Sequence, residues 1–254
     1  MITLAGKAAV VTGGSRGIGA ATVKLLAQAG ADVVFNYHHS KDAAQQVEQE
    51  ARRHGVRVEA VKADLSKVKE CDRLVKFARE RLGRLDILVA NAGIWNAEDV
   101  PIERMSERQW DEMLAANLKS VYGVIRATVP HMKAQKSGRI IAVSSTAGQR
   151  GEAYHTHYGA SKGAIISFVK GLSTELAPHG ILVNCVAPGW VDTEMSAPVL
   201  KTKAGWKFAT AAIPMGRVGT AEEIAGPIVF LASDLAAFVQ GEILNVNGGA
   251  VLCG

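Results

Sequence analysis

The chain has 254 residues, 48% of them hydrophobic, which is enough for one large α/β domain with a substantial core. Its net charge of +5 suits an anionic ligand, but the charges are scattered rather than gathered in a stripe, which argues against a nucleic-acid partner. No apolar run reaches the roughly 18 residues of a membrane helix, and we expect neither a leader nor a membrane segment. Three cysteines without a CxxC pair indicate a reducing compartment, so we expect a cytoplasmic protein.

The first predicted elements are a buried strand over residues 7–12, a glycine-rich turn over residues 12–19 and a helix over residues 20–29. This order predicts a phosphate site, because glycine lets backbone N–H groups approach a pyrophosphate and the helix N-terminus adds a favourable partial charge. The spacing is G-x-x-x-G-x-G rather than G-x-G-x-x-G. A turn that merely links strand to helix is the alternative that this stretch alone leaves open.

Further strands are predicted over residues 31–37, 56–63, 86–90, 139–144, 181–186 and 242–246, and helices over residues 41–54, 68–82, 106–135, 158–178 and 221–232. This alternation predicts an α/β fold in which residues 1–254 form a single domain, a Rossmann-type doubly wound parallel sheet of about seven strands with helices on both faces. Gly13, Asp64, Asn91, Ser145 and Pro188 each follow a strand. The carboxyl ends of parallel strands share one edge, where open α/β sheets bind their ligands.

Tyr158 and Lys162 are four residues apart on a predicted helix and therefore face the same side. A nearby cation favours phenolate, so we expect Lys162 to lower the pKa of Tyr158 and to make it a proton donor or acceptor near neutral pH. The alternative for this motif alone is an exposed tyrosine and a solvated lysine on a surface helix.

Taken together, the motifs resemble those of the short-chain dehydrogenase/reductase family over nearly the whole chain. They are Thr12-Gly13-x-x-x-Gly17-x-Gly19, Asp64, Asn91-Ala92-Gly93, Asn117, Ser145, Tyr158-x-x-x-Lys162 and Pro188-Gly189 with Thr193. Within the family, residues 213–219, 222–225 and 245–249 are most similar to 3-oxoacyl-[acyl-carrier-protein] reductases. Many sugar and alcohol dehydrogenases share this tail.

The resemblance implies a catalytic tetrad. Tyr158 would protonate a carbonyl oxygen as hydride arrives from a nicotinamide, and Lys162 would hold the nicotinamide ribose. Ser145 would bind the substrate oxygen and stabilise its developing charge. Asn117 would hold a water that connects Lys162 to solvent, and the alternative for Asn117 is a polar helix residue bonded to nearby backbone.

The resemblance also implies a set of cofactor-binding residues, in which Asp64 would cap the adenine pocket and Thr193 with Val191 would hold the carboxamide. No acidic residue follows the second strand before Asp42, whereas Arg16 adds a cation to the glycine turn, so we expect NADP(H). His38 stands where relatives have a second basic residue, and its partial charge leaves NAD(H) use open. The full set is Gly13, Ser15, Arg16, Gly17, Ile18, Gly19, Asn36, Tyr37, His38, Asp64, Leu65, Asn91, Ala92, Gly93, Tyr158, Lys162, Pro188, Gly189, Val191 and Thr193.

The activity that these expectations favour is NADPH-dependent reduction of a small carbonyl substrate, a 3-oxoacyl thioester of fatty-acid synthesis. Residues 194–212 are expected to form a mobile loop that covers the substrate. Two alternatives stay open, a sugar, polyol or secondary-alcohol dehydrogenase of the same family and a non-catalytic NADP-binding sensor or scaffold.

Possible partners are suggested by basic residues and by the resemblance. Lys136, Arg139 and His179 are expected around the mouth of the site, where cations would suit an acyl carrier protein, although His179 is weaker than the arginine of carrier-binding relatives. His155 and His157 lack a third ligand, so we expect no metal and expect His155 or His157 to line the substrate mouth. Relatives assemble as tetramers, and a homotetramer is expected here.

Overall fold

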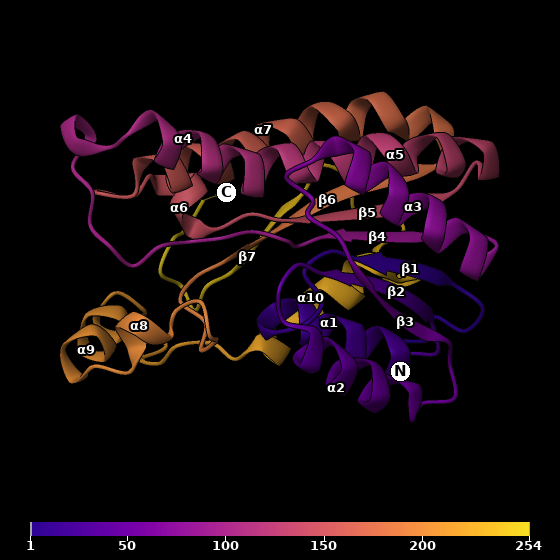
Figure 1. Ribbon diagram of the computed structural model, residues 1–254, viewed down its shortest axis with the longest axis horizontal. Helices are drawn as coiled ribbons and strands as arrows, with labels where there is room; N and C mark the ends of the chain where they lie inside the picture. The colour runs from indigo at the N-terminus through magenta and orange to yellow at the C-terminus, as the bar shows by residue number, and fades with distance from the viewer. Residues whose placement is uncertain (1, 254) are drawn as a thin grey trace.

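The computed structural model describes residues 2–253, and within them seven parallel strands form one sheet (Figure 1). The strand order is β3-β2-β1-β4-β5-β6-β7, so the chain winds outwards from β1, returns to β4 and winds outwards the other way. This confirms the predicted doubly wound α/β fold. The strands are β1 (Ala8–Val11), β2 (Asp32–Tyr37), β3 (Val58–Lys62), β4 (Ile87–Ala90), β5 (Gly138–Val143), β6 (Ile181–Pro188) and β7 (Ile243–Val246).

Helices cover both faces of the sheet (Figure 1). One face carries α1 (Gly17–Gln28), α2 (Lys41–Arg52) and α10 (Ala221–Ala232). The other carries α3 (Val68–Leu82), α5 (Ser120–Gln135) and α7 (Thr156–Leu176), with α4 (Glu107–Leu114) beyond the carboxyl edge. Among residues 2–253, no helix combines the length and the apolar character that crossing a membrane requires.

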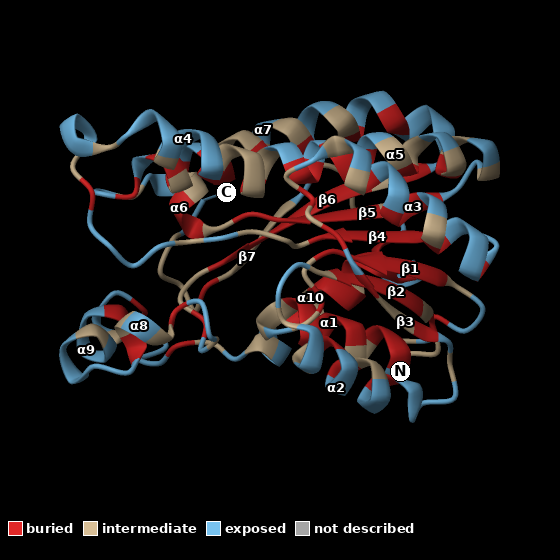
Figure 2. Cartoon of the chain, viewed as in Figure 1, coloured by how far each residue is buried: buried red, intermediate tan, exposed pale blue. Residues whose placement is uncertain are grey.

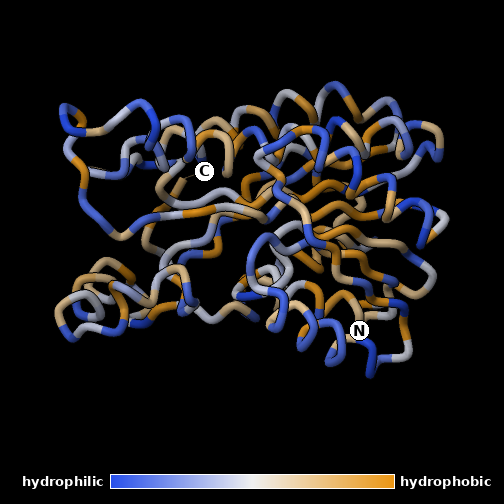
Figure 3. The backbone as a smooth tube through the Cα atoms, in the orientation of Figure 1, coloured by the Kyte–Doolittle hydropathy of each residue, from blue (hydrophilic) through white to orange (hydrophobic). Residues whose placement is uncertain are grey.

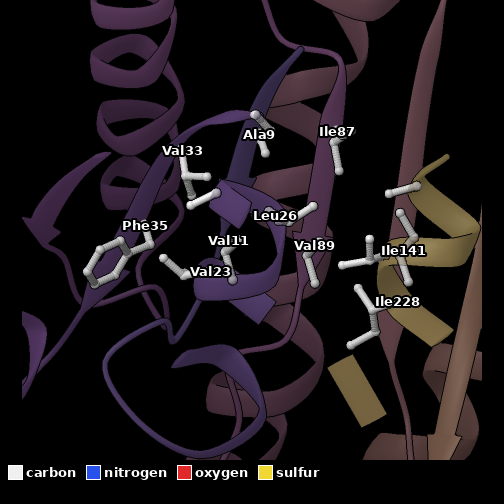
Figure 4. Close-up of a cluster of buried hydrophobic side chains, with 14 of the residues drawn as sticks. Ala9, Val11, Val23, Leu26, Val33, Phe35, Ile87, Val89, Ile141 and Ile228 are labelled. Carbon is white, nitrogen blue, oxygen red and sulfur yellow. The ribbon is translucent and has the colours of Figure 1, made fainter. Parts of the chain in front are cut away.

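The central strands β1 and β4 are apolar along their whole length because both faces of the sheet are buried there (Figure 2). Successive side chains of a strand point to opposite faces, so Ala9 and Val11 of β1 pack toward α1 while Val10 packs toward α3. Figure 4 shows the first of these two layers, in which Val11 lies near Val23 of α1. Figure 3 shows the complementary pattern, with hydrophilic residues on the outer turns of the helices.

Residues 194–212 differ from the expected irregular loop. They contain the helices α8 (Ala197–Leu200) and α9 (Lys203–Ala211), which project beyond the carboxyl edge of the sheet (Figure 1). Thr202 caps α9 by accepting a hydrogen bond from the Gly205 N–H at 3.0 Å. Leu200 and Ala209 belong to a small apolar cluster of their own. The prediction of an irregular loop was wrong because this cluster gives the segment enough apolar burial to hold two short helices.

Candidate active site

The glycine turn between β1 and α1 is held by side chains from two neighbouring strands. The Thr12 hydroxyl oxygen accepts hydrogen bonds from the N–H groups of Asn91 and Ala92, both at 2.9 Å. The Asn36 side chain accepts a hydrogen bond from the Gly13 N–H at 2.9 Å. Asn36 is buried, so its amide shapes the turn, and its predicted role in the cofactor site is indirect.

The first turn of α1 is suited to an anion. Its N-cap is Arg16, and no side chain among the described residues caps the helix. A Cβ atom at Gly19 would lie 2.1 Å from the carbonyl oxygen of Gly13, so the chain can approach this closely only with glycine. The free N–H groups and the helix dipole together favour a phosphate at this point.

A cavity of about 400 Å³ extends from this turn past the ends of β2 and β3. His38, which follows β2, and Arg16 of the glycine turn both line this cavity. The His38 ring packs against His39, with ring centroids 3.7 Å apart. Asp64 lines the cavity after β3, and a hydrogen bond from the Ser66 hydroxyl holds the pKa of Asp64 below its ordinary value. Every cofactor-binding residue predicted from the sequence lines this cavity or the smaller one that adjoins it.

The adjoining cavity measures about 140 Å³, and Ser145, Tyr158 and Lys162 line it together. Ser145 follows β5 and is hydrogen-bonded to the Tyr158 side chain. Lys162 is only 5% exposed, and its Nζ donates a hydrogen bond to the carbonyl oxygen of Val143 at 2.9 Å. Tyr158 and Lys162 share one face of α7, with the lysine Nζ 5.9 Å from the centre of the tyrosine ring.

A short helix that the sequence did not predict, α6 (Thr146–Arg150), fixes Ser145 against α7. Ser145 caps this helix by accepting a hydrogen bond from the Ala147 N–H at 3.1 Å. A Cβ atom at Gly148 would lie 2.5 Å from the carbonyl carbon of Lys162, so α6 packs directly on the α7 backbone. The neighbouring Ser144 hydroxyl donates to the Lys162 carbonyl oxygen at 2.8 Å. The serine cap followed by glycine was the only sequence signal for this contact.

Burial dominates the ionisation of Tyr158 and Lys162. It raises the pKa of Tyr158 to about 12, although the hydrogen bond with Ser145 acts in the opposite direction. It also lowers the pKa of Lys162 to about 8. The pKa of Tyr158 is therefore above its ordinary value, and not below it as was expected from the sequence, because loss of water outweighs the hydrogen bond with Ser145.

Asn117 lies in a π-helical turn (Ala115–Lys119) between α4 and α5. Its side chain accepts a hydrogen bond from the Ile94 N–H at 2.7 Å and donates one to the Ile94 carbonyl oxygen at 3.0 Å. A Cβ atom at Gly93 would lie 3.1 Å from Asn117 Oδ1 and 3.4 Å from Lys162 Nζ. Asn117 is thus close to Lys162 but lines neither cavity. Its hydrogen bonds to the Ile94 backbone are those expected of a polar helix residue bonded to nearby backbone, the alternative named for it above.

The expected basic residues do not surround the mouth. Arg139 is near the start of β5, whereas Ser145 follows the end of this strand. About 20 Å of extended chain therefore separates the two residues. Arg139 pairs with Asp234 at 3.0 Å at that opposite edge. Lys136 lies at the same edge. Its carbonyl oxygen is in close contact with Gly180, the residue before β6, and leaves no room there for a Cβ atom. The predicted placement of these two cations and of His179 was wrong, because closeness in sequence to Ser145 does not say at which end of a strand a residue lies.

The mouth of the smaller cavity is instead lined by aromatic residues. Trp95 stacks on His155 with ring centroids 5.1 Å apart and meets Trp190 edge-on at 5.8 Å. Both tryptophans line the cavity, whereas His155 and His157 are buried behind it, which corrects the prediction that one of them lines the mouth. Over residues 2–253, no group of three or more His, Cys, Asp or Glu residues is placed to hold a metal ion.

Glu152, Trp95 and Trp190 were not singled out from the sequence, although Trp95 and Glu152 lie in residues 94–100 and 148–155, where substrate contacts are expected. Each tryptophan follows a recognised motif at a short distance, Trp95 after Asn91-Ala92-Gly93 and Trp190 after Pro188-Gly189. That proximity was the only available signal, because substrate-facing positions of this site carry no common pattern.

The chain is similar to known proteins over nearly its whole length. A family model described as enoyl-(acyl carrier protein) reductase matches residues 13–251. The chain is 40% identical over 253 residues to a 3-oxoacyl-[acyl-carrier-protein] reductase of Synechocystis, covering 99% of this chain and 100% of that protein. It is 39% identical over 243 residues to the 3-oxoacyl-[acyl-carrier-protein] reductase FabG of Staphylococcus aureus, covering 96% and 97%.

Two similar solved structures contain NADP. One is a short chain dehydrogenase from Burkholderia cenocepacia in complex with NADP, with 34% identity, a TM-score of 0.90 and coverage of 97% of this chain and 98% of that one. The other, from Beutenbergia cavernae, is named as a candidate NAD(P)-dependent gluconate 5-dehydrogenase with bound NADP at low occupancy. It has 37% identity, a TM-score of 0.91 and coverage of 98% of both chains.

We predict that Lys162→Met stabilises the fold at neutral pH. The lysine pKa is about 8 in the folded chain against an ordinary 10.5, so below pH 8 both states carry the charge and its burial destabilises the folded one. Removing it should raise the free energy of unfolding at pH 7 by roughly 1–3 kcal/mol. The gain should shrink between about pH 8 and 10.5, where the unfolded parent binds more protons than the folded one.

Urea denaturation at pH 7 and pH 9 measures this effect. Lys170→Met is the matched control, because Lys170 is exposed on the same helix. A Lys162→Met protein that is less stable than the parent at pH 7 would contradict the burial argument.

Proposed function

The chain belongs to the short-chain dehydrogenase/reductase family, and we propose that it is an NADPH-dependent reductase of 3-oxoacyl thioesters. Family membership makes it an oxidoreductase that acts on CH–OH and C=O groups. The observation that carries the proposal is the meeting of Ser145, Tyr158 and Lys162 in one small cavity beside the anion site of α1. The names of relatives at about 40% identity over nearly the whole chain support a 3-oxo rather than an enoyl thioester.

The larger cavity fits a dinucleotide that carries a 2′-phosphate. The free N–H groups of the first turn of α1 would hold the pyrophosphate. Arg16 and His38 would meet the 2′-phosphate, and no acidic residue follows β2 before Asp42, whereas NAD sites have a carboxylate in this region. When bound, NADPH supplies the hydride. The NADP bound in the Burkholderia relative supports this assignment.

The residues of the smaller cavity would bind the carbonyl and supply its proton. The Ser145 hydroxyl accepts from the Ala147 N–H, which leaves its own proton to donate to the substrate oxygen. Tyr158 then transfers its proton to the same oxygen as negative charge develops. Its pKa of about 12 keeps the phenol protonated at neutral pH, and the Lys162 ammonium, one turn along α7, stabilises the phenolate that remains.

The second candidate is oxidation of a sugar, polyol or secondary alcohol. It is favoured by the similarity to the candidate gluconate 5-dehydrogenase and by the absence of Lys136, Arg139 and His179 from the cavity linings. The cations that were expected to bind an acyl carrier protein are therefore not found beside the cavities. The raised pKa of Tyr158 favours reduction, because oxidation requires the phenolate to accept a proton.

We predict that the purified protein consumes NADPH, followed at 340 nm, with acetoacetyl-CoA as substrate, and that Tyr158→Phe slows this reaction at least about 100-fold. NADPH fluorescence should show that the variant still binds NADPH. Tyr122→Phe, on an exposed tyrosine of α5, should leave the rate unchanged. Turnover of sugars or alcohols with NADP⁺, and none of acetoacetyl-CoA, would move the protein to the second candidate.

We predict that His38→Asp reverses the cofactor preference. An aspartate after β2 would accept the ribose hydroxyls of NADH and repel a 2′-phosphate, so kcat/KM with NADPH should fall at least about tenfold relative to NADH. His54→Asp, at an exposed position after α2, adds the same charge outside the cavity and should leave the ratio unchanged. An unaltered ratio in His38→Asp would remove His38 from the cofactor site.

We also propose that the chain assembles as a homotetramer. Ile243 and Leu244 of β7 remain only half-buried at the open edge of the sheet, and Leu235 and Phe238 are exposed nearby in sequence. Further copies of the chain would cover this apolar edge. Light scattering should give the mass of four chains, and the mass of one chain would contradict the proposal.

A further inference from the structure

Glu152 lines the same small cavity as Tyr158 and Lys162. It lies in the turn between α6 and α7, and its side chain is only 19% exposed. A Cβ atom at Gly159 would lie 3.3 Å from the Glu152 nitrogen, so the first turns of α7 pack on this segment. The backbone that carries Glu152 thus packs on the same helix that carries Tyr158.

The negative charge of Glu152 is poorly compensated. Among residues 2–253, its single ion-pair partner is Arg150, at 3.5 Å, and the Arg150 side chain is half exposed. An ion pair of this length at the surface is weak. The one cation in the cavity lining is Lys162, whose Nζ is directed to the Val143 carbonyl oxygen. The charge of Glu152 reaches the reacting groups, since it helps to raise the pKa of Tyr158.

Apart from Glu152 and Lys162, the side chains that line this cavity carry no charge. Trp95, Trp190 and Met195 are among them, and none of the three offers a positive charge. A carboxylate one carbon away from a substrate's keto group would therefore enter a wall that holds a fixed negative charge. A neutral ester or thioester in the same place would meet no such repulsion.

We propose that Glu152 is a specificity-determining residue. It excludes carbonyl compounds that carry a free carboxylate one carbon away from the keto group, and it admits their neutral esters and thioesters. This inference rests on the proposed carbonyl reduction and narrows its substrate class. A 3-oxoacyl thioester is neutral at this end of the molecule, whereas a free 3-oxo acid or a keto sugar acid is anionic. Glu152 would thus disfavour sugar acids by charge, whereas it would not repel the neutral sugars, polyols and alcohols of the second candidate function.

The test compares acetoacetate with ethyl acetoacetate, which share one keto skeleton and differ in charge. The parent should reduce the ester with the higher kcat/KM. In Glu152→Gln, kcat/KM for acetoacetate should rise about tenfold, the size of a like-charge repulsion at a partly exposed site, while that for the ester changes less than threefold. Glu152→Lys should move the preference further toward acetoacetate. Glu175→Gln removes an exposed charge at the far end of α7 and should leave both values unchanged.

A binding measurement separates this inference from the proposed function. Trp95 and Trp190 line the cavity, so tryptophan fluorescence can follow both ligands without turnover. Acetoacetate should bind about tenfold more tightly to Glu152→Gln than to the parent, and the ester equally to both. If that result appears without reduction of any keto compound, the inference stands and the proposed function fails. An acid-to-ester ratio that is unchanged in Glu152→Gln overturns the inference, whether or not the esters are reduced.

Discussion

The burial of the Lys162 ammonium is the constraint on which the site depends. A cation that is 5% exposed needs an acceptor at short range, and the Val143 carbonyl oxygen supplies it at the end of β5. That bond requires α7 to lie close over β5, and the contact of Gly148 with the Lys162 backbone keeps it there. The same closeness brings Ser145, which follows β5, against Tyr158 of α7. The arrangement that makes Lys162 costly to bury is thus the one that assembles the reacting groups.

The doubly wound sheet explains why these groups meet. Parallel strands deliver the segments that follow them to one edge, and buried polar side chains then fix those segments to one another. Thr12 ties the glycine turn to the segment after β4, and Asn36 ties it to β2. Asn117 does the same for the backbone at Ile94. Such residues contribute to function by positioning the backbone, because their polar atoms are already engaged within the chain.

Much of the fold could be predicted from the sequence, since its signals are local. The bounds predicted for helices α3 and α10 agree with the structure, in which Thr220 and Glu223 form a capping box at the start of α10. How deeply a side chain is buried, and which distant segments pack against it, cannot be predicted from such local signals. Spacing placed Tyr158 beside Lys162, but the sign of the Tyr158 pKa shift depends on burial that only the folded chain sets. Glu152 likewise carries no motif, and it became visible only when α6 and α7 were seen to place it in the cavity.

The pH dependence of kcat/KM for reduction of a neutral keto ester with NADPH tests the central claim most directly. If Tyr158 donates the proton, kcat/KM should be constant through neutral pH and fall at alkaline pH, first as the Lys162 ammonium loses its proton and then as the phenol does. The second fall, which belongs to the phenol, should be absent from the residual activity of Tyr158→Phe. A kcat/KM that increases with pH in the parent would mean that the reacting group must first lose its proton, and it would contradict the assignment of Tyr158 as the acid.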